Sequence, residues 1–165
     1  MKTISHHNRS IWLAALALFV LLMGIYMLSF QGVPVTDDEQ LFVSAAQSLA
    51  IQGELSAAQM YGNTLLAGVY SGIGPLHPIL AAPIYQLLQN TNLGTVQALY
   101  LLTPVYTALT AVVVFLLALH LGYRPRTGLA AGLLFGLSTI AWPYSQTFFR
   151  EPLAALLLLS AWLCF

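Results

Sequence analysis

The chain has 165 residues, of which 59% are apolar and only 6% are charged, and its mean hydropathy is +0.81. Soluble domains carry about 25% charged residues, so this composition indicates an integral membrane protein. The formal net charge is zero, and no basic face that could attract nucleic acid is expected. The single cysteine, Cys164, excludes an internal disulfide and cannot form a thiolate metal site by itself.

The first long apolar segment covers residues 11–30. About 20 residues at 1.5 Å per residue cross a hydrocarbon core of about 30 Å. Lys2 and Arg9 precede this segment, and no Ala-x-Ala cleavage pattern follows it. We therefore expect a retained signal anchor with a cytoplasmic N-terminus, so that the next residues emerge on the outer side of the membrane.

Residues 31–94 are expected to form one large external loop with two short interfacial helices, at about residues 38–52 and 77–89. The difficult part is the segment 65–88, which is apolar enough to span but is interrupted by glycines and prolines. If it crossed the membrane, Arg124 and Arg126 would lie outside, against the positive-inside bias. We favour an interfacial or re-entrant placement, with a full crossing as the alternative.

Three further membrane spans are expected after this loop, at about residues 96–121, 129–144 and 152–165. The turn with Arg124 and Arg126 would lie in the cytoplasm between the first two of these spans. The last segment covers only about 21 Å at helical rise, less than a bilayer core. The sequence therefore predicts an all-α, polytopic transmembrane helix bundle, of which this chain would be the N-terminal part.

An acidic triplet, Asp37 to Glu39, follows the first span. Thr36 and Glu39 have the spacing of a capping box, and Gly53 is a plausible helix stop. A helix cap needs one acidic residue, whereas this one has three at the membrane surface. We therefore expect one of the carboxylates to have a chemical function in addition to the cap.

A second polar cluster, Arg150-Glu151, follows the third expected span. Two crossings separate Glu39 from Arg150, which places both clusters at the outer face. A carboxylate there could act as a general base on an acceptor hydroxyl, while Arg150 holds a phosphate through its planar fork of donors. A divalent cation that bridges acidic groups and phosphate oxygens would serve the same purpose.

The segment Gly74-Pro75-Leu76-His77-Pro78 is a third candidate. A single histidine beside two prolines more often has a structural role than a catalytic one. The segment could still shape a groove in the external loop.

These motifs together resemble the N-terminal part of the polytopic GT-C glycosyltransferases, in particular protein O-mannosyltransferases and aminoarabinose transferases. The resemblance rests on the signal anchor, on Thr36-Asp37-Asp38-Glu39 opening a helix in a large external loop, on the segment 74–78, and on the polar junction 145–153 before an apolar helix. One departure concerns the substrate. Close aminoarabinose-transferase relatives have Lys-Pro-Pro where this chain has Ile73-Gly74-Pro75, which removes a positive charge.

The resemblance implies transfer of a sugar from a polyprenyl-phosphate carrier to a lipid, glycan or protein acceptor on the extracytoplasmic side of a bacterial inner membrane. In that family an Asp-Glu pair supplies the catalytic carboxylate, which corresponds here to Asp38. If the motif is aligned one residue earlier, it corresponds to Asp37. The residues expected to contact substrate or phosphate are Glu39, Arg150, Glu151 and His77. If a divalent cation such as Mg²⁺ or Mn²⁺ takes part, Asp38 and Glu151 are its expected ligands. The alternative function is a non-catalytic transporter or membrane assembly subunit with a re-entrant segment.

Overall fold

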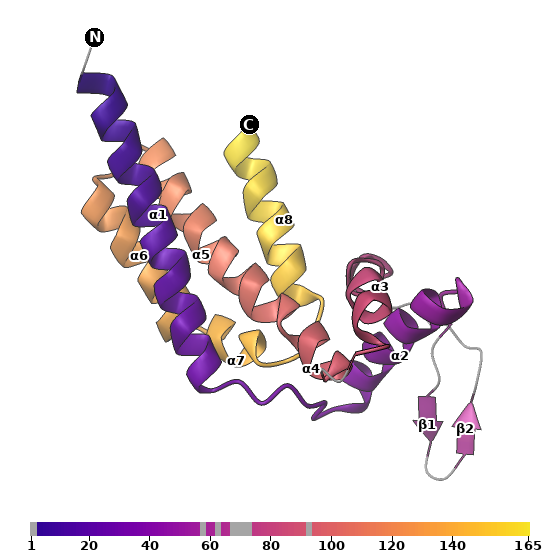
Figure 1. Cartoon of the computed structure of the whole chain (residues 1–165). Coiled ribbons are helices and arrows are strands. Elements are labelled where there is room, and N and C mark those ends of the chain that lie inside the picture. The colour runs from indigo at the N-terminus through magenta and orange to yellow at the C-terminus, as the bar shows by residue number, and fades with distance from the viewer. Residues whose placement is uncertain (1–2, 57–58, 62–63, 67–73, 92–93) are drawn as a thin grey trace. The chain divides into compact units, whose positions relative to one another are not determined.

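The computed structural model describes residues 3–56, 59–61, 64–66, 74–91 and 94–165. The described residues are mainly helical, as expected, with one short antiparallel ribbon (Figure 1). The chain divides into two compact units, which we describe separately. The first unit combines Met1–Phe30, Pro104–Ser145 and Glu151–Phe165, and the second combines Gln31–Thr103 and Gln146–Arg150.

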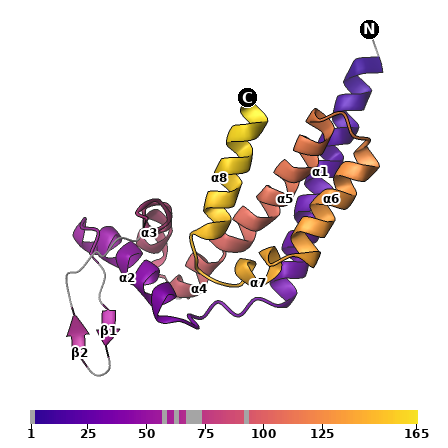
Figure 2. The same ribbon diagram turned by 180° about the vertical axis from the view of Figure 1, so that it is seen from behind.

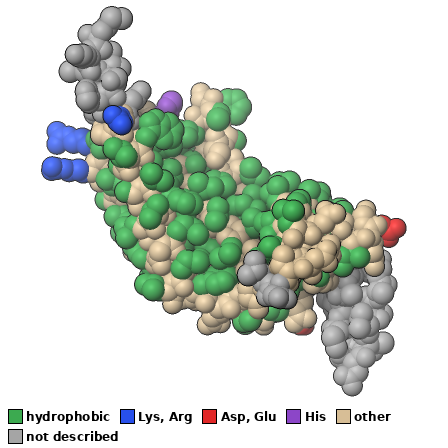
Figure 3. All heavy atoms as spheres, viewed as in Figure 1, with side chains coloured by type: hydrophobic (Ala, Val, Ile, Leu, Met, Phe, Trp, Pro, Cys, Tyr) green, Lys and Arg blue, Asp and Glu red, His purple; other side chains and the backbone are tan. Residues whose placement is uncertain are grey.

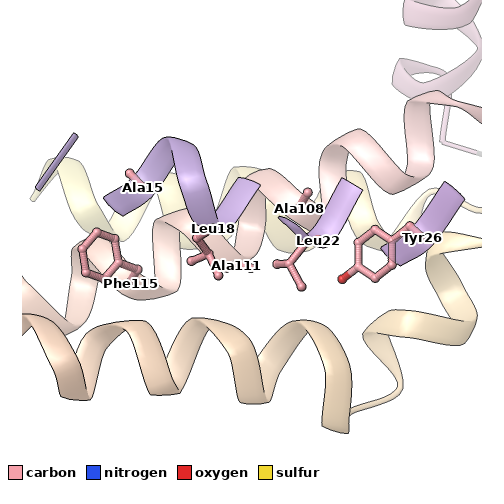
Figure 4. Close-up of a cluster of buried hydrophobic side chains, with 7 residues drawn as sticks. All are labelled: Ala15, Leu18, Leu22, Tyr26, Ala108, Ala111 and Phe115. Atoms are coloured by element: carbon pink, nitrogen blue, oxygen red, sulfur yellow. The ribbon is translucent and has the colours of Figure 1, made fainter. Parts of the chain in front are cut away.

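The first unit is a group of apolar helices. Its helices are α1 (Thr3–Leu28), α5 (Leu102–His120, from Pro104 onward), α6 (Pro125–Ser138), α7 (Ala141–Ser145) and α8 (Glu151–Cys164). The core lies where α1, α5 and α6 meet (Figures 1 and 4). The fully buried side chains there are Ala15, Leu18, Leu22, Tyr26, Ala108, Ala111 and Phe115.

Glycines at every fourth position of α6 allow this close packing. A Cβ on Gly132 would lie 2.8 Å from Leu18 Cδ2 and 2.9 Å from the backbone oxygen of Ala111. At Gly136, the hydroxyl of Tyr26 donates a hydrogen bond to the backbone oxygen at 2.9 Å. Small residues therefore bring the backbone of α6 against both neighbouring helices.

These contacts also fix the directions of the helices within the first unit. Leu18 and Leu22 of α1 meet Gly132 and Gly136 of α6 in the same order, so α1 and α6 run parallel. Ala111 and Phe115 of α5 meet Gly132 and Gly128 in the reverse order, so α5 runs antiparallel to both (Figure 2). The end of α1 and the start of α5 therefore lie at the same end of this unit.

Basic side chains gather at the opposite end of the first unit. Arg9 lies near the start of α1, and Arg124 and Arg126 lie at the start of α6, all three exposed. Figure 3 shows arginine side chains, in blue, together where α1 begins and α5 turns into α6. Apolar side chains cover most of the rest of this unit in the same view.

Two helical stretches among the described residues are long and apolar enough to cross a membrane, namely Arg9–Leu28 and Thr95–His120. Large apolar side chains such as Trp12, Leu16 and Val20 are exposed on the first of these. The last helix, α8, is shorter but also apolar, and it is buried only near its start, at Pro152 and Leu153.

The helix expected over residues 129–144 is divided in the structure. α6 begins earlier, with Pro125 in its first turn, and ends at Ser138, after which Thr139 is extended. The Thr139 hydroxyl donates to the backbone oxygen of Phe135 and accepts from the backbone N–H of Ala141. Pro143 lacks the N–H that would continue the helix through Thr139, so the chain restarts as the short helix α7.

The second unit contains α2 (Asp37–Gln52), α3 (Leu76–Leu88) and α4 (Thr95–Tyr100), with α3 packed against both of the others. It also contains a two-stranded antiparallel ribbon, β1 (Gln59–Tyr61) and β2 (Thr64–Leu66). From the sequence, only helices were expected in this region. The predicted capping box of α2 is confirmed, because Thr36 and Glu39 bond reciprocally. The helix ends at Gly53 in the left-handed conformation, as expected.

The segment expected to be interfacial or re-entrant, residues 65–88, lies partly outside the described residues, at 67–73. Its described part holds the end of β2 and the helix α3, which contains Pro83. The expected span 96–121 is covered by α4 and α5 with a turn at Leu101. Pro104 lacks the N–H that would bond to the carbonyl of Tyr100, which accounts for this interruption.

Candidate functional site

The three neighbouring carboxylates at the start of α2 differ in their exposure to solvent. Asp37 and Asp38 are exposed, whereas Glu39 has no exposed surface. All three lie in the first turn of the helix, where negative charge is favoured by the helix dipole. The two aspartates are therefore available to a ligand, and the glutamate is committed to contacts inside the second unit.

Backbone N–H groups surround the Glu39 carboxylate. Its Oε2 accepts hydrogen bonds from the backbone N–H groups of Val35 at 2.6 Å and Thr36 at 3.2 Å. Its Oε1 accepts from the backbone N–H of Phe148 at 3.2 Å, a residue 109 positions away. The hydroxyl of Tyr100 also interacts electrostatically with this carboxylate. A buried carboxylate with several such donors is stabilised in the folded unit and ties the start of α2 to the segment 146–150.

Aromatic rings pack around His77, the histidine of the Gly74–Pro78 motif. The imidazole is only 1% exposed, and its ring centroid lies 4.2 Å from that of Phe148 and 5.8 Å from that of Phe42. Phe148 in turn lies against Tyr100, with ring centroids 5.3 Å apart. Burial lowers the pKa of His77 to about 4, so its imidazole is neutral near pH 7. The neutral imidazole packs among aromatic rings in this structure, and the expected contact of His77 with substrate stays a prediction.

Arg150 is exposed and its guanidinium lies over the start of the Gly74–Pro78 motif. A Cβ on Gly74 would be 3.4 Å from Arg150 Nη1 and 3.7 Å from Arg150 Cδ. A methyl group at Gly74 would therefore be in ordinary van der Waals contact with the guanidinium, which lies over this position. The second unit thus holds together three segments that the sequence singled out separately: the acidic start of α2, the start of α3, and the segment that ends at Arg150.

Glu151 belongs to the other compact unit, although it follows Arg150 in the chain. It is exposed in the first turn of α8 and lines a cavity of about 310 Å³ between α5, α6, α7 and α8. The other lining residues are mostly apolar or carry hydroxyl groups, namely Thr107, Thr110, Phe135, Thr139, Ile140, Ala141, Tyr144, Pro152 and Ala155. The pair Arg150-Glu151 is therefore divided between a polar site and an apolar cavity.

Two of the residues expected to contact phosphate, Glu39 and His77, are buried in this structure. Glu39 is buried and accepts hydrogen bonds from backbone N–H groups, and its expected contact with phosphate stays a prediction. Phe148 and Tyr100 were not singled out from the sequence, yet they form the wall against which His77 and Glu39 pack. The only signal for Phe148 was an aromatic pair inside an otherwise polar junction between two apolar helices.

Metal ligation by Asp38 and Glu151 was the expectation for a cation-dependent enzyme. Among the residues that the structure describes, no group of three His, Cys, Asp or Glu side chains is placed to hold a metal ion. Asp37 and Asp38 provide oxygen ligands of the kind that Mg²⁺ accepts, but two adjacent carboxylates are fewer than a metal site built from protein alone requires.

The start of α2 therefore offers two exposed carboxylates and the segment 146–150 one exposed guanidinium, and a buried hydrogen bond connects these two segments. Comparison of the chain with models of known families, with curated proteins and with solved structures finds no match.

Proposed function

We propose that this protein is a membrane glycosyltransferase of the GT-C type, which transfers a sugar from a polyprenyl-phosphate carrier to a lipid, glycan or protein acceptor on the extracytoplasmic side. The observation that supports this most is the hydrogen bond between Glu39 and the backbone N–H of Phe148. It joins the segment with the exposed carboxylates to the segment with the exposed guanidinium. A transferase of this kind needs both groups, one for the acceptor and one for the leaving phosphate.

In the proposed reaction, Asp38 removes the proton from the acceptor hydroxyl as its oxygen attacks the anomeric carbon of the sugar. The bond between that carbon and the phosphate oxygen breaks, and the polyprenyl phosphate leaves with the bonding electrons. Arg150 stabilises the charge on the departing phosphate through its fork of N–H donors. Asp37 is the rival base, because both aspartates are exposed in the same helical turn.

The apolar cavity of the first unit supports the choice of a lipid-linked donor. Its volume of about 310 Å³ and its mostly apolar lining suit part of an isoprenoid chain. The helix α5, which belongs to the membrane-length stretch Thr95–His120, lines this cavity, so a carrier would reach it from the lipid phase.

The orientation that we propose follows from the helix directions within the first unit. The end with Arg9, Arg124 and Arg126 faces the cytoplasm, as the positive-inside rule predicts. Because α1 and α5 are antiparallel, residues 31–101 leave and return at the opposite end of that unit. This arrangement agrees with an external segment that makes no net crossing.

Substitution of the two aspartates tests this function. Asp38→Asn should reduce sugar transfer by at least about 100-fold, because the contribution of a general base is typically of that size or larger. Asp37→Asn should have a much smaller effect if Asp38 is the base. The measurement is the transfer of radiolabelled sugar from a polyprenyl-phosphate donor in vesicles that contain the full-length protein.

Glu54→Gln is the matched control, because Glu54 is an exposed carboxylate of the same unit that lies outside α2. This variant should retain wild-type transfer. If Asp37→Asn and Asp38→Asn both retain full transfer, neither aspartate is the base and the proposed mechanism fails.

A further inference from the structure

We infer that Glu39 is a positioning residue, which ties the segment 146–150 to the start of α2 and so holds Arg150 in its place over Gly74. The effect of Glu39 on sugar transfer rests on the proposed function. The hydrogen bond between Glu39 and Phe148 does not depend on that function. It differs from the expectation that Glu39 contacts substrate. The side chain would act through Phe148 and Arg150, without touching the reacting groups.

The two oxygens of Glu39 have separate tasks. Oε2 accepts from the N–H groups of Val35 and Thr36 and so closes the local cap of α2. Oε1 accepts from the N–H of Phe148 and so reaches a distant segment of the chain. A capping box requires only the first of these, so the second oxygen is available to position the segment with Arg150.

The segment 146–150 has irregular structure and makes no strand or helix of its own. Its backbone is therefore not held by a regular ladder of hydrogen bonds, and each individual contact matters more. The contacts that hold it include the Glu39 bond at Phe148, the packing of the Phe148 ring on His77 and Tyr100, and the guanidinium of Arg150 over Gly74. Glu39 supplies the charge-assisted hydrogen bond in this set.

The variant Glu39→Gln separates the two tasks. A carboxamide has one accepting oxygen, and its NH₂ group cannot accept a hydrogen bond. We expect the oxygen to stay with the two nearby donors of the cap, so that the N–H of Phe148 loses its acceptor. Loss of a hydrogen bond to a charged group should speed exchange of the Phe148 amide hydrogen by about tenfold to a hundredfold.

Hydrogen exchange of the full chain in detergent micelles or nanodiscs measures this effect without reference to activity. Ser48→Ala is the matched control, because it removes a hydrogen bond to Gln52 in the same helix and should leave the Phe148 amide unchanged. Unchanged exchange in Glu39→Gln would overturn the inference. Equal acceleration in both variants would also overturn it, because the effect would then be a general loss of stability.

A second pair of variants keeps the test valid if Glu39→Gln does not fold. Phe148→Pro and Phe148→Leu both remove the aromatic ring, but only the proline also removes the backbone N–H. The Arg150 amide should exchange faster in Phe148→Pro than in Phe148→Leu. Equal exchange in the two variants would show that the hydrogen bond does not hold the segment.

Kinetics then connect the position of this segment with the proposed reaction. Glu39→Gln should raise KM for the polyprenyl-phosphate donor about tenfold, and the double variant Glu39→Gln/Arg150→Ala should be no worse than Arg150→Ala alone. Additive losses would contradict a role through Arg150. If the full-length wild-type protein transfers no sugar, the proposed function fails while the exchange experiment still decides whether Glu39 positions the segment.

Discussion

Neighbouring residues of one acidic triplet meet different environments because a helix turns by about 100° per residue. Asp37 and Asp38 are exposed at the start of α2, and Glu39 points into the second unit. The same local signal, an acidic first turn, thus contains two chemically available carboxylates and one structural carboxylate. Only the exposed pair is suited to a proton transfer with a substrate.

The buried imidazole of His77 predicts a pH dependence of stability. Its pKa is about 4 in the folded chain and about 6.5 in an unfolded chain, so the unfolded chain binds more protons between these values. Stability should therefore fall as the pH drops from about 6.5 to about 4, by on the order of 3 kcal/mol from this residue. His77→Phe should remove most of this loss, measured as the change in Tm between neutral pH and about pH 4.5.

His120→Gln is the control for that experiment, because His120 is exposed at the end of α5. Its Tm should fall with pH as much as that of the wild type. An equal fall in His77→Phe would contradict the assignment of this acid sensitivity to the buried imidazole.

At the scale of the elements, the helix α6 packs through a face that carries no side chains. Gly128, Gly132 and Gly136 are all buried and form one face, so α1 and α5 approach its backbone directly. Most helices pack through side chains that interdigitate, whereas this one packs through its own backbone. The helix therefore tolerates little change on that face.

Gly132→Ala should destabilise the first unit by about 1–3 kcal/mol, because the added methyl group would press against the backbone oxygen of Ala111 as well as Leu18. Backbone at such a contact cannot move aside as a side-chain end can. Gly24→Ala on α1 is the matched control, because nothing lies within 4 Å of the added Cβ and the change should stabilise the helix by about 0.5–1 kcal/mol. Thermal unfolding in detergent measures both, and equal Tm values in the two variants would contradict this account of α6.

At the scale of the whole molecule, the chain alternates between two units. It leaves the first unit after α1, returns at α5, leaves again after α7 and returns at α8. Both excursions, residues 31–103 and 146–150, belong to the same second unit. Segments from distant parts of the sequence are therefore brought together within the second unit.

The proposed topology predicts opposite accessibility for two arginine positions. In a Cys164→Ser background, Arg126→Cys should react with a membrane-impermeant reagent only from the cytoplasmic side, and Arg150→Cys only from the outer side. Arg9→Cys should behave like Arg126→Cys, because α1 and α6 run parallel and both residues lie near the starts of these helices. Labelling of positions 126 and 150 from the same side would contradict the topology.

Local signals in the sequence were enough to predict several features of the fold. The capping box at Thr36 and Glu39, the stop at Gly53 and the apolar segments depend on residues within a few positions of one another. The two helices of the loop were also expected close to where they occur. The break after Ser138 could have been anticipated from Pro143, and the ribbon from the Gly62-Asn63 pair between its strands, a residue combination common in hairpins.

The sequence by itself thus determined the apolar, helical character of this protein and the cap at the start of α2, because helix caps and apolar periodicity are local. Only the tertiary structure decided that Glu39 bonds to Phe148, that His77 is enclosed by aromatic rings and that Arg150 lies over Gly74. Each of these contacts joins segments far apart in the chain. Burial and hydrogen-bond partners depend on which segments meet, and no local pattern specifies that meeting.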